Sequence, residues 1–233
     1  MYSLDYEIRY NDYKDFDTVR PVTALEVIQD IAIRDSSEMG YDLDTLKNMG
    51  VAWLLKGFNV HFEKPISTHA PLEAFTAIQR TKASTSERGS VIKQNGEVIV
   101  KSIANWFLFS AERMRPCKIP PEMASVCELY DFEDEFFTYQ KPASVPGLEP
   151  EYYVRVSNKD IDTNRHINNL KSAEILMDTL PFEYFFSDMA IIYKKQAYLG
   201  DTLGVCSKKT DGGYYASLID KDRNICVEAT FTN

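Results

Sequence analysis

Residues 23–40 have the pattern of an amphipathic helix. The apolar positions recur every three or four residues and share one face: Ala24, Ile28, Ile31 and Ala32. Thr23 and Glu26 have the spacing of a capping box at a helix start. Gly40 can adopt the left-handed backbone conformation that ends a helix. The pattern predicts a long helix with one buried face.

A second amphipathic pattern occupies residues 168–180. Its apolar stripe consists of Leu170, Ala173, Leu176, Met177 and Leu180. Each helix precedes strand-like segments, at 51–66, 71–81, 89–94 and 97–110 in the first half and at 189–199, 202–210, 214–220 and 224–233 in the second. Strands that follow one another without helices between them predict antiparallel sheets, and each sheet must cover its helix. The predicted fold class is therefore α+β. Each half of the chain is predicted to form an antiparallel sheet wrapped around one helix.

The segments that enter the two helices resemble one another. They align without a gap and are identical at six of twelve positions, with KDFDTVRPVTAL at 14–25 and KDIDTNRHINNL at 159–170. This alignment sets Asp17 against Asp162 and Pro21 against His166. We expect residues present in both copies to build the bend before the helix. Polar residues present in the second copy alone, such as Asn164 and His166, are expected to serve a function.

Residues 116–149 have neither a helical nor a strand period. Six of the ten prolines lie between Pro116 and Pro150, together with the acidic run 133–135. This composition predicts a linker over residues 116–149. We therefore expect an N-terminal domain over 1–115 and a C-terminal domain over 150–233.

The composition excludes several classes of protein. The 233 residues include 26 basic and 35 acidic ones, and the net charge of −9 argues against general affinity for nucleic acid or anionic membranes. No signal peptide and no run of roughly 20 apolar residues is visible. The cysteines form no C-x-x-C pair and predict reduced thiols without a metal: Cys117, Cys127, Cys206 and Cys226. These features predict a cytoplasmic protein without a membrane span.

Residues 160–172, DIDTNRHINNLKS, resemble the signature D-x-D-x-N-x-H-V-N-N-x-K-Y in the second domain of acyl-acyl carrier protein (ACP) thioesterases. This family comprises the plant Fat-type enzymes and their bacterial relatives. Residues 27–42 and 50–65 resemble the first domain of the same family. The resemblance implies a tandem, or double, hotdog fold with the acyl-chain pocket in the N-terminal domain. It also implies hydrolysis of acyl-ACP without a cofactor, which releases free fatty acid and ends fatty acid synthesis.

Carried over by position, the resemblance implies that Asp162, Asn164 and His166 are catalytic. The family has a fourth residue, a Glu, after a Y-[KR]-[KR] sequence, and here Gln196 stands at that position after Tyr193. We expect Asp162 and His166 to share water activation and proton transfer and Asn164 to position the water or the carbonyl. Backbone N–H groups at the start of the second helix would receive the oxyanion.

Other activities compete with this interpretation. An acyl-coenzyme A thioesterase would use the same residues, and a non-catalytic acyl-binding double hotdog would fit the exchange of Glu for Gln196. A hotdog dehydratase would need an acidic residue that the sequence does not place. Covalent catalysis finds little support, because the chain has no G-x-S-x-G motif and nothing places Cys206 beside His166. His61 and His69 are expected to lie on a strand and in a loop, outside the site.

The expected partner is an acyl carrier protein that bears an acyl thioester. Such carriers are acidic, so docking on this acidic chain depends on local cations. The candidates are Arg113, Arg115 and Lys118 in the first half and Lys159, Arg165, Lys171, Lys194 and Lys195 in the second. A homodimer is an open alternative to a monomer, because hotdog units commonly pair and the duplication can meet that need within one chain.

Overall fold

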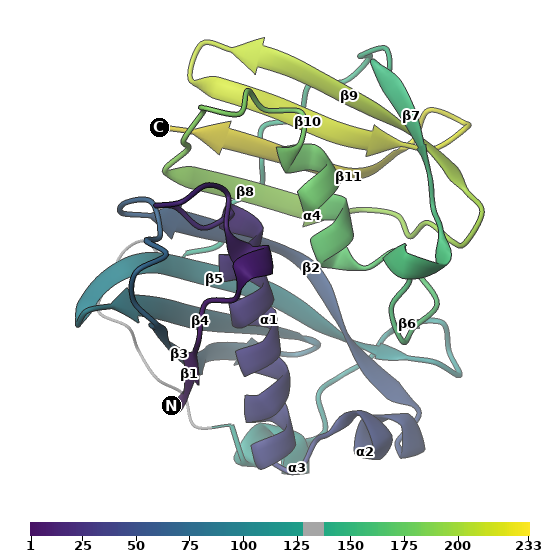
Figure 1. Cartoon of the computed structure of the whole chain (residues 1–233). Helices are drawn as coiled ribbons and strands as arrows, with labels where there is room; N and C mark the ends of the chain where they lie inside the picture. Colours follow the sequence, from purple (N-terminus) through teal and green to yellow (C-terminus); the bar gives the residue numbers. More distant parts are fainter. Residues whose placement is uncertain (128–137) are drawn as a thin grey trace. The chain divides into compact units, whose positions relative to one another are not determined.

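The computed structural model describes residues 1–127 and 138–233 (Figure 1). The chain divides into two compact units, which we call the N-terminal unit, Met1–Tyr139, and the C-terminal unit, Gln140–Asn233. Part of the predicted linker, residues 128–137, lies outside the described residues. None of the described helices is both long and apolar enough to cross a bilayer.

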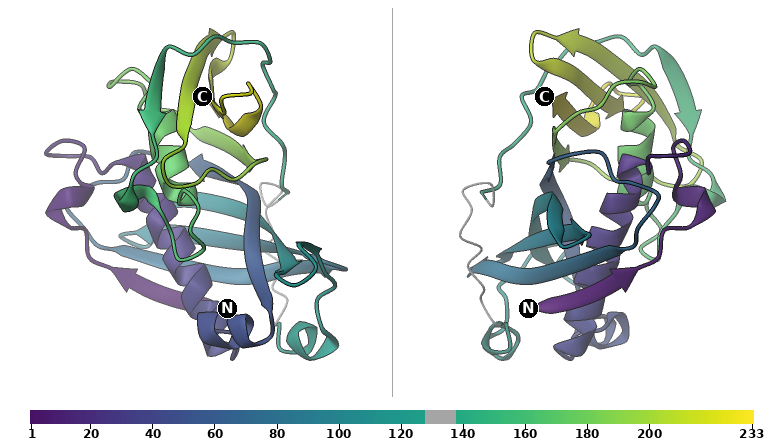
Figure 2. Two further views of the ribbon diagram at one scale, coloured as in Figure 1. Left: turned by 90° about the vertical axis from the view of Figure 1, so that its right-hand side faces the viewer. Right: turned by 60° about the vertical axis from the view of Figure 1, so that its left-hand side comes forward.

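The N-terminal unit is an antiparallel sheet with a long helix against one face (Figure 2). Its strands lie in the order β1-β3-β4-β5-β2, and a short β6 pairs with β5. Their bounds are β1 Tyr2–Tyr6, β2 Val51–Phe62, β3 Leu72–Lys82, β4 Thr85–Gln94, β5 Glu97–Ser110 and β6 Arg115–Pro116. The helical elements are η1 Tyr10–Asp12, α1 Pro21–Glu38, α2 Leu43–Asn48 and α3 Pro121–Ser125.

Helix α1 begins two residues before the predicted capping box. Arg20 is the N-cap and Pro21 the first helical residue, a position that suits the fixed φ of proline. The predicted capping box of Thr23 and Glu26 is therefore wrong. The predicted apolar face is confirmed, since all four of its residues are buried. Gly40 has a φ of +86° beyond the helix end, and its N–H donates to the carbonyl of Ser37.

Thr23 instead lies inside α1, fully buried, and its hydroxyl has no hydrogen-bond partner among the described residues. A buried hydroxyl without a partner costs roughly 1–3 kcal/mol. We expect Thr23→Val, which keeps the shape of the side chain, to raise the free energy of unfolding by about 1 kcal/mol. Urea denaturation measures this change. A loss of stability in the variant would show that the hydroxyl is satisfied.

Helix α3 lies in the segment where the sequence predicted a linker without secondary structure. Its Met123 is 2% exposed and packs in one cluster with Leu46 and Leu108. A helix of five residues is too short to show a period in the sequence. Through Met123 this segment contributes to the core of the N-terminal unit, whereas residues 121, 122 and 125 are exposed. The expectation that the segment has no regular element is wrong at α3.

The C-terminal unit repeats the plan with a shorter helix. Its antiparallel strands lie in the order β8-β11-β10-β9-β7. The elements are β7 Tyr152–Arg155, η2 Asn158–Asp160, α4 Asn169–Met177, β8 Asp188–Tyr193, β9 Thr202–Thr210, β10 Gly213–Ile219 and β11 Ile225–Thr232. Helix α4 contacts β10 and β11. In each unit, antiparallel strands pack against one helix, as the sequence predicts.

The apolar stripe predicted for α4 is only partly correct. Ala173 and Leu176 are fully buried, but Leu170 and Met177 are half-buried, and Leu180 lies beyond the helix end at Met177. Helix α4 has 9 residues, whereas α1 has 18. A shorter helix has fewer turns, so the apolar spacing in its sequence is a weaker guide to which residues are buried.

Candidate functional site

The residues singled out in the sequence lie in a tight turn between η2 and α4. The N–H of Asp162 donates to the carbonyl of His166 at 2.9 Å, and the N–H of Arg165 donates to the carbonyl of Asp162 at 3.0 Å. Arg165 has a φ of +64°, in the left-handed region that turns of this kind require. We call residues 162–166 the motif turn. It brings Asp162 and His166 opposite one another, with Asn164 exposed at its tip.

The carboxylate of Asp162 holds the motif turn from inside. Its Oδ1 accepts the N–H of Asn164 at 2.8 Å and the N–H of His166 at 3.3 Å. Asp side chains commonly stabilise turns in this way. The second oxygen, Oδ2, accepts no hydrogen bond from the described part of the chain. Asp162 therefore stabilises the turn through Oδ1, while Oδ2 has no hydrogen-bond partner among the described residues.

The segment after β8 pairs with the far side of the motif turn. His166 and Tyr198 form an antiparallel bridge, and the N–H of Ile167 donates to the carbonyl of Ala197 at 2.9 Å. A further bridge joins Ile161 to Ile167. Ile167 and Ala197 are buried. Three short backbone segments thus form a small antiparallel ribbon with one buried side.

Side chains alternate between the two sides of such a ribbon. Because Ile167 and Ala197 point inward, the residues beside them point outward. We call this outward group the site face. It consists of Asp162, His166 and Tyr198, and the exposed Gln196 is assigned to it by the same alternation, because its neighbour Ala197 is buried. The structure therefore brings three of the four predicted site residues onto one surface, and the fourth, Asn164, lies at the tip of the turn beside them.

Tyr198 is a member of the site face that the sequence reasoning missed. Its ring packs edge-on against that of His166, with centroids 5.0 Å apart and planes at 67°. Tyr198 remains 52% exposed, and its N–H donates to Asp201 Oδ2 at 2.8 Å. The signal was available in the alternation of a strand, because Tyr198 lies two residues after Gln196. An aromatic ring on His166 restricts the orientations that the imidazole can take.

The start of α4 lies directly after the motif turn. Asn168 is the N-cap, and its Oδ1 accepts the N–H of Leu170 at 2.8 Å. The hydroxyl of Tyr193 donates to the carbonyl of Asn169 at 3.0 Å, which fixes the first helical residue to the end of β8. The N–H groups of Asn169 and Lys171 have no partner within the described residues. These two groups can bind an anionic oxygen.

Hydrogen bonds show how the two copies correspond. In the N-terminal unit the N–H of Lys14 donates to the carbonyl of Thr18, and Thr18 forms a bridge with Ser67. These are the bonds that Asp162 and His166 make in the second copy. Thr18 is therefore the counterpart of His166, and Lys14 that of Asp162. The gapless alignment of the two segments is wrong by three residues, and it paired Asp162 with Asp17 in error.

The corrected correspondence reveals a carboxylate that both copies share. Asp160 accepts the N–H and the hydroxyl of Ser157, and Asp12 accepts the N–H of Arg9 and the hydroxyl of Tyr6. Burial raises the pKa of each carboxyl, but the hydrogen bonds outweigh burial, above all those from the Arg9 guanidinium to Asp12 and from the Ser157 hydroxyl to Asp160. Both pKa values therefore lie below the ordinary value for Asp. Asp12 and Asp160 are thus structural carboxylates that fix the two 3-10 turns η1 and η2.

Three of the proposed docking cations already have partners. The ammonium groups of Lys194 and Lys195 lie 2.5 Å from Glu228 Oε1 and Asp220 Oδ2, and Lys171 pairs with Glu174. Lys159 and Arg165 form no ion pair with the described residues. Among the five candidate cations of the C-terminal unit, these two are the ones without an ion pair to a described residue.

The remaining candidate residues lie away from the site. His61 is on β2 and His69 in the turn before β3, both in the N-terminal unit. All four cysteines are free thiols. Cys206 is buried, and burial raises its pKa, so the thiolate needed for nucleophilic attack is disfavoured. Among the described residues, no cluster of His, Cys, Asp and Glu has the geometry of a metal site.

Comparisons with known proteins cover both units. Residues 1–127 match the model of the acyl-ACP thioesterase N-terminal domain, and residues 146–228 match that of the acyl-ACP thioesterase C-terminal domain. A comparison with curated protein sequences gave no match.

Two solved structures are similar over nearly the whole chain. An acyl-ACP thioesterase from Bacteroides thetaiotaomicron has a TM-score of 0.83 at 15% identity, with 99% of this chain and 96% of that chain covered. The 12:0-ACP thioesterase from Umbellularia californica has a TM-score of 0.85 at 16% identity, with the same coverage. At such identities the likeness concerns the fold, and it confirms the predicted tandem hotdog architecture.

Proposed function

The chain belongs to the acyl-ACP thioesterase family, and we infer from this premise that it hydrolyses the thioester bond of acyl-ACP and releases the free fatty acid. The observation that carries the assignment of the site is the site face. Asp162, His166 and Gln196 point outward from one ribbon beside the start of α4. A water-activating pair next to free helix N–H groups is the arrangement that thioester hydrolysis requires.

Asp162 and His166 activate the attacking water in this proposal. Asp162 keeps one carboxylate oxygen free of protein hydrogen bonds, and the imidazole of His166 lies on the same face. One of the two groups accepts the proton of the water as it attacks the carbonyl carbon, and the proton then passes to the departing thiolate. A thiolate is a good leaving group, so this last transfer is the least demanding step.

In this proposal, Asn164 and the N–H groups at the start of α4 bind the thioester carbonyl of the substrate. The carboxamide of Asn164, exposed at the tip of the motif turn, can donate to the carbonyl oxygen or hold the water. The free N–H groups of Asn169 and Lys171 stabilise the negative charge that develops on that oxygen. The N-cap Asn168 supports this role indirectly, because its own side chain satisfies only the N–H of Leu170.

Gln196 orients a water or a neighbouring side chain, because an amide does not ionise. We expect Gln196→Glu to keep or raise turnover, since a carboxylate at this exposed position can accept the same hydrogen bonds and can also act as a base. A pH profile of kcat measures this. If the new carboxyl takes part, an acidic limb appears at roughly pH 4–5, near the ordinary pKa of Glu.

Gln196→Met provides the matched control for this prediction. Met has nearly the same length as Gln but lacks the amide, so turnover should fall if the amide orients a reacting group. Full turnover in the Met variant would remove Gln196 from the site.

We propose that the N-terminal unit holds the acyl chain, in the layer between α1 and the sheet. The side chains of Ala74, Ile92 and Val100 lie opposite one another on neighbouring strands β3, β4 and β5, and all three are almost fully buried. Apolar surface in this layer favours an apolar ligand over water. This row supports a site for an elongated apolar group.

A direct assay tests the proposed function. The protein is incubated with matched acyl groups on ACP and on coenzyme A, and the released fatty acid is quantified. Faster release from ACP is expected. Equal or faster release from coenzyme A would favour an acyl-coenzyme A thioesterase. No release from either carrier would favour a non-catalytic acyl-binding protein.

A variant with reversed charges at Lys159 and Arg165 then shows whether these cations contribute to the preference for ACP.

We also propose that the protein works in a reducing compartment such as the cytoplasm. Its four cysteines are free thiols, and Cys226 is buried with its pKa raised by burial to about 11. Free thiols are typical of proteins in reducing surroundings.

A further inference from the structure

An ion pair joins the helix and the sheet inside the N-terminal unit. The guanidinium of Arg88 on β4 contacts the carboxylate of Asp35 on α1, and their side chains are 8% and 15% exposed. Arg88 Nη1 also lies 3.4 Å from the hydroxyl of Thr76 on β3. Because one partner belongs to the sheet and the other to the helix, the Arg88 side chain crosses the layer between them.

The same part of the layer is lined with hydroxyl groups. Thr76 Oγ1 lies 2.9 Å from Ser90 Oγ, and Ser90 is two residues from Arg88 on β4, so all three side chains lie on the face of the sheet that meets α1. Ser102 pairs with Ser90 across the strands, and its buried hydroxyl has no partner among the described residues. The layer is therefore polar where Arg88 crosses it.

Stability alone does not account for a buried ion pair at this place. Two buried charges lose their hydration, and well-packed apolar residues of similar volume generally serve as well or better. The apolar neighbours Ile92 and Val100 show that the same layer accommodates aliphatic side chains. The pair therefore points to a role in selecting which ligands can enter between the helix and the sheet.

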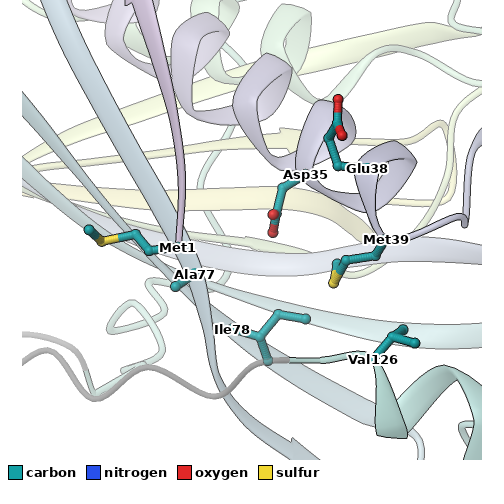
Figure 3. A pocket seen from close by; sticks show the side chains of 7 residues that line it. All are labelled: Met1, Asp35, Glu38, Met39, Ala77, Ile78 and Val126. Carbon is teal, nitrogen blue, oxygen red and sulfur yellow. The ribbon is translucent and has the colours of Figure 1, made fainter.

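A cavity of about 330 Å³ adjoins the ion pair. Figure 3 shows Asp35 pointing into this cavity, whereas Glu38 on the same helix points away from it. The lining residues are Met1, Asp35, Glu38, Met39, Ala77, Ile78 and Val126. Asp35 is thus at once a wall of the cavity and the partner of Arg88. The Arg88–Asp35 pair thus connects a residue that lines the cavity to the hydroxyl groups of the layer, through the contact of Arg88 with Thr76.

We propose that the Arg88–Asp35 pair limits the length of the acyl chain that this enzyme accepts. The inference rests on the proposed function, in which the N-terminal unit holds the acyl chain. A chain that reaches Arg88 meets a guanidinium group held in place by its ion pair, and the added methylene groups find no apolar space. Removal of both side chains joins the layer to the cavity and lets longer chains enter.

The test uses the double variant Arg88→Ala/Asp35→Ala, which leaves no buried charge unpaired. The kcat/KM values for octanoyl-, dodecanoyl- and hexadecanoyl-ACP are measured for the wild type and the variant. One methylene in an apolar pocket changes discrimination by about 10-fold or more, so the ratio of the long to the short substrate should rise by at least about 10-fold. Cooperative thermal unfolding confirms that the variant is folded. If it is not, Arg88→Val/Asp35→Leu takes its place, because Val is still much shorter than Arg.

The matched control is Arg34→Ala/Asp30→Ala. It removes an Arg–Asp pair of the same helix, but this pair is half-exposed, so the substrate ratio should not change. An unchanged ratio in the folded Arg88–Asp35 variant, or an equal rise in both double variants, would overturn the inference and leave the proposed hydrolase function standing. Absence of hydrolysis in the wild type would instead contradict the proposed function itself.

Discussion

The variant His166→Ala should lose about 10²–10⁴-fold in kcat while it folds normally, because it removes one half of the proposed acid–base pair. The fold should survive since His166 is tied to the structure through its backbone. Its carbonyl accepts the N–H of Asp162, and its bridge to Tyr198 is a backbone pairing. The measurement is single-substrate kinetics on acyl-ACP, with circular dichroism and thermal unfolding of the same preparation.

Thr18→Ala is the matched control for His166→Ala. Thr18 occupies the equivalent position in the N-terminal unit, with the same backbone bonds and no proposed part in the chemistry. Its removal should leave kcat unchanged. A folded His166→Ala enzyme with nearly normal kcat would exclude His166 from catalysis, and an equal loss in both variants would point to a general loss of structure.

The variant Asp162→Asn separates the two roles of Asp162. Asn retains an Oδ1 that can accept the N–H groups of Asn164 and His166, so the motif turn and the free energy of unfolding should change little. It lacks the negative charge, so it cannot accept a proton from water. We expect kcat to fall by about 10²–10⁴-fold, with KM nearly unchanged.

Comparison with Asp162→Ala completes this test. The Ala variant loses the bonds to the turn as well as the charge, so it should be less stable than the Asn variant by about 1 kcal/mol. If Asp162→Asn retains wild-type kcat and only Asp162→Ala is impaired, the carboxylate acts purely in the turn. Urea denaturation and kinetics on the three proteins distinguish these outcomes.

The periodicity of the sequence was sufficient to predict the architecture. The apolar face of α1 has four residues at helical spacing, and all of them are buried. Most strands after each helix fall close to their predicted positions because alternation in a half-buried sheet is strict. The predicted bounds are wrong where β4 begins at Thr85 instead of 89 and where β8 ends at Tyr193 instead of 199. Helix α3 escaped prediction because five residues do not complete two turns.

The helix starts could not be predicted from motif spacing alone. Thr23 and Glu26 satisfied the spacing of a capping box, but Pro21 fixed an earlier start. The comparison of the two copies failed for a related reason. Six chance identities favoured a gapless alignment, whereas backbone hydrogen bonds set the correspondence three residues away. Hydrogen-bond partners depend on the chain that returns after β8, and the local sequence does not contain that information.

The residues of the candidate site could be proposed from the sequence, but their arrangement could not. The motif pointed to Asp162, Asn164 and His166, but only the ribbon assigns Gln196 to the face of Asp162 and His166 and shows that Tyr198 packs on His166. Both of these residues follow β8, roughly thirty positions after the motif in the sequence. Pairing between distant segments is decided by tertiary structure, which periodicity does not describe.

The shared turn of the two copies bears on how such enzymes evolve. In residues 14–18 the N–H of Lys14 donates to the carbonyl of Thr18, as that of Asp162 does to His166. The side chains nevertheless are those of Lys14, Phe16 and Thr18 where the second copy carries acid, amide and imidazole. After a duplication, one copy can lose its reactive side chains without losing its shape, because Asp12 and the backbone maintain the bend. The backbone structure of the turn and its reactive side chains can therefore change independently in evolution. Selection can retain the structure while the reactive side chains are lost.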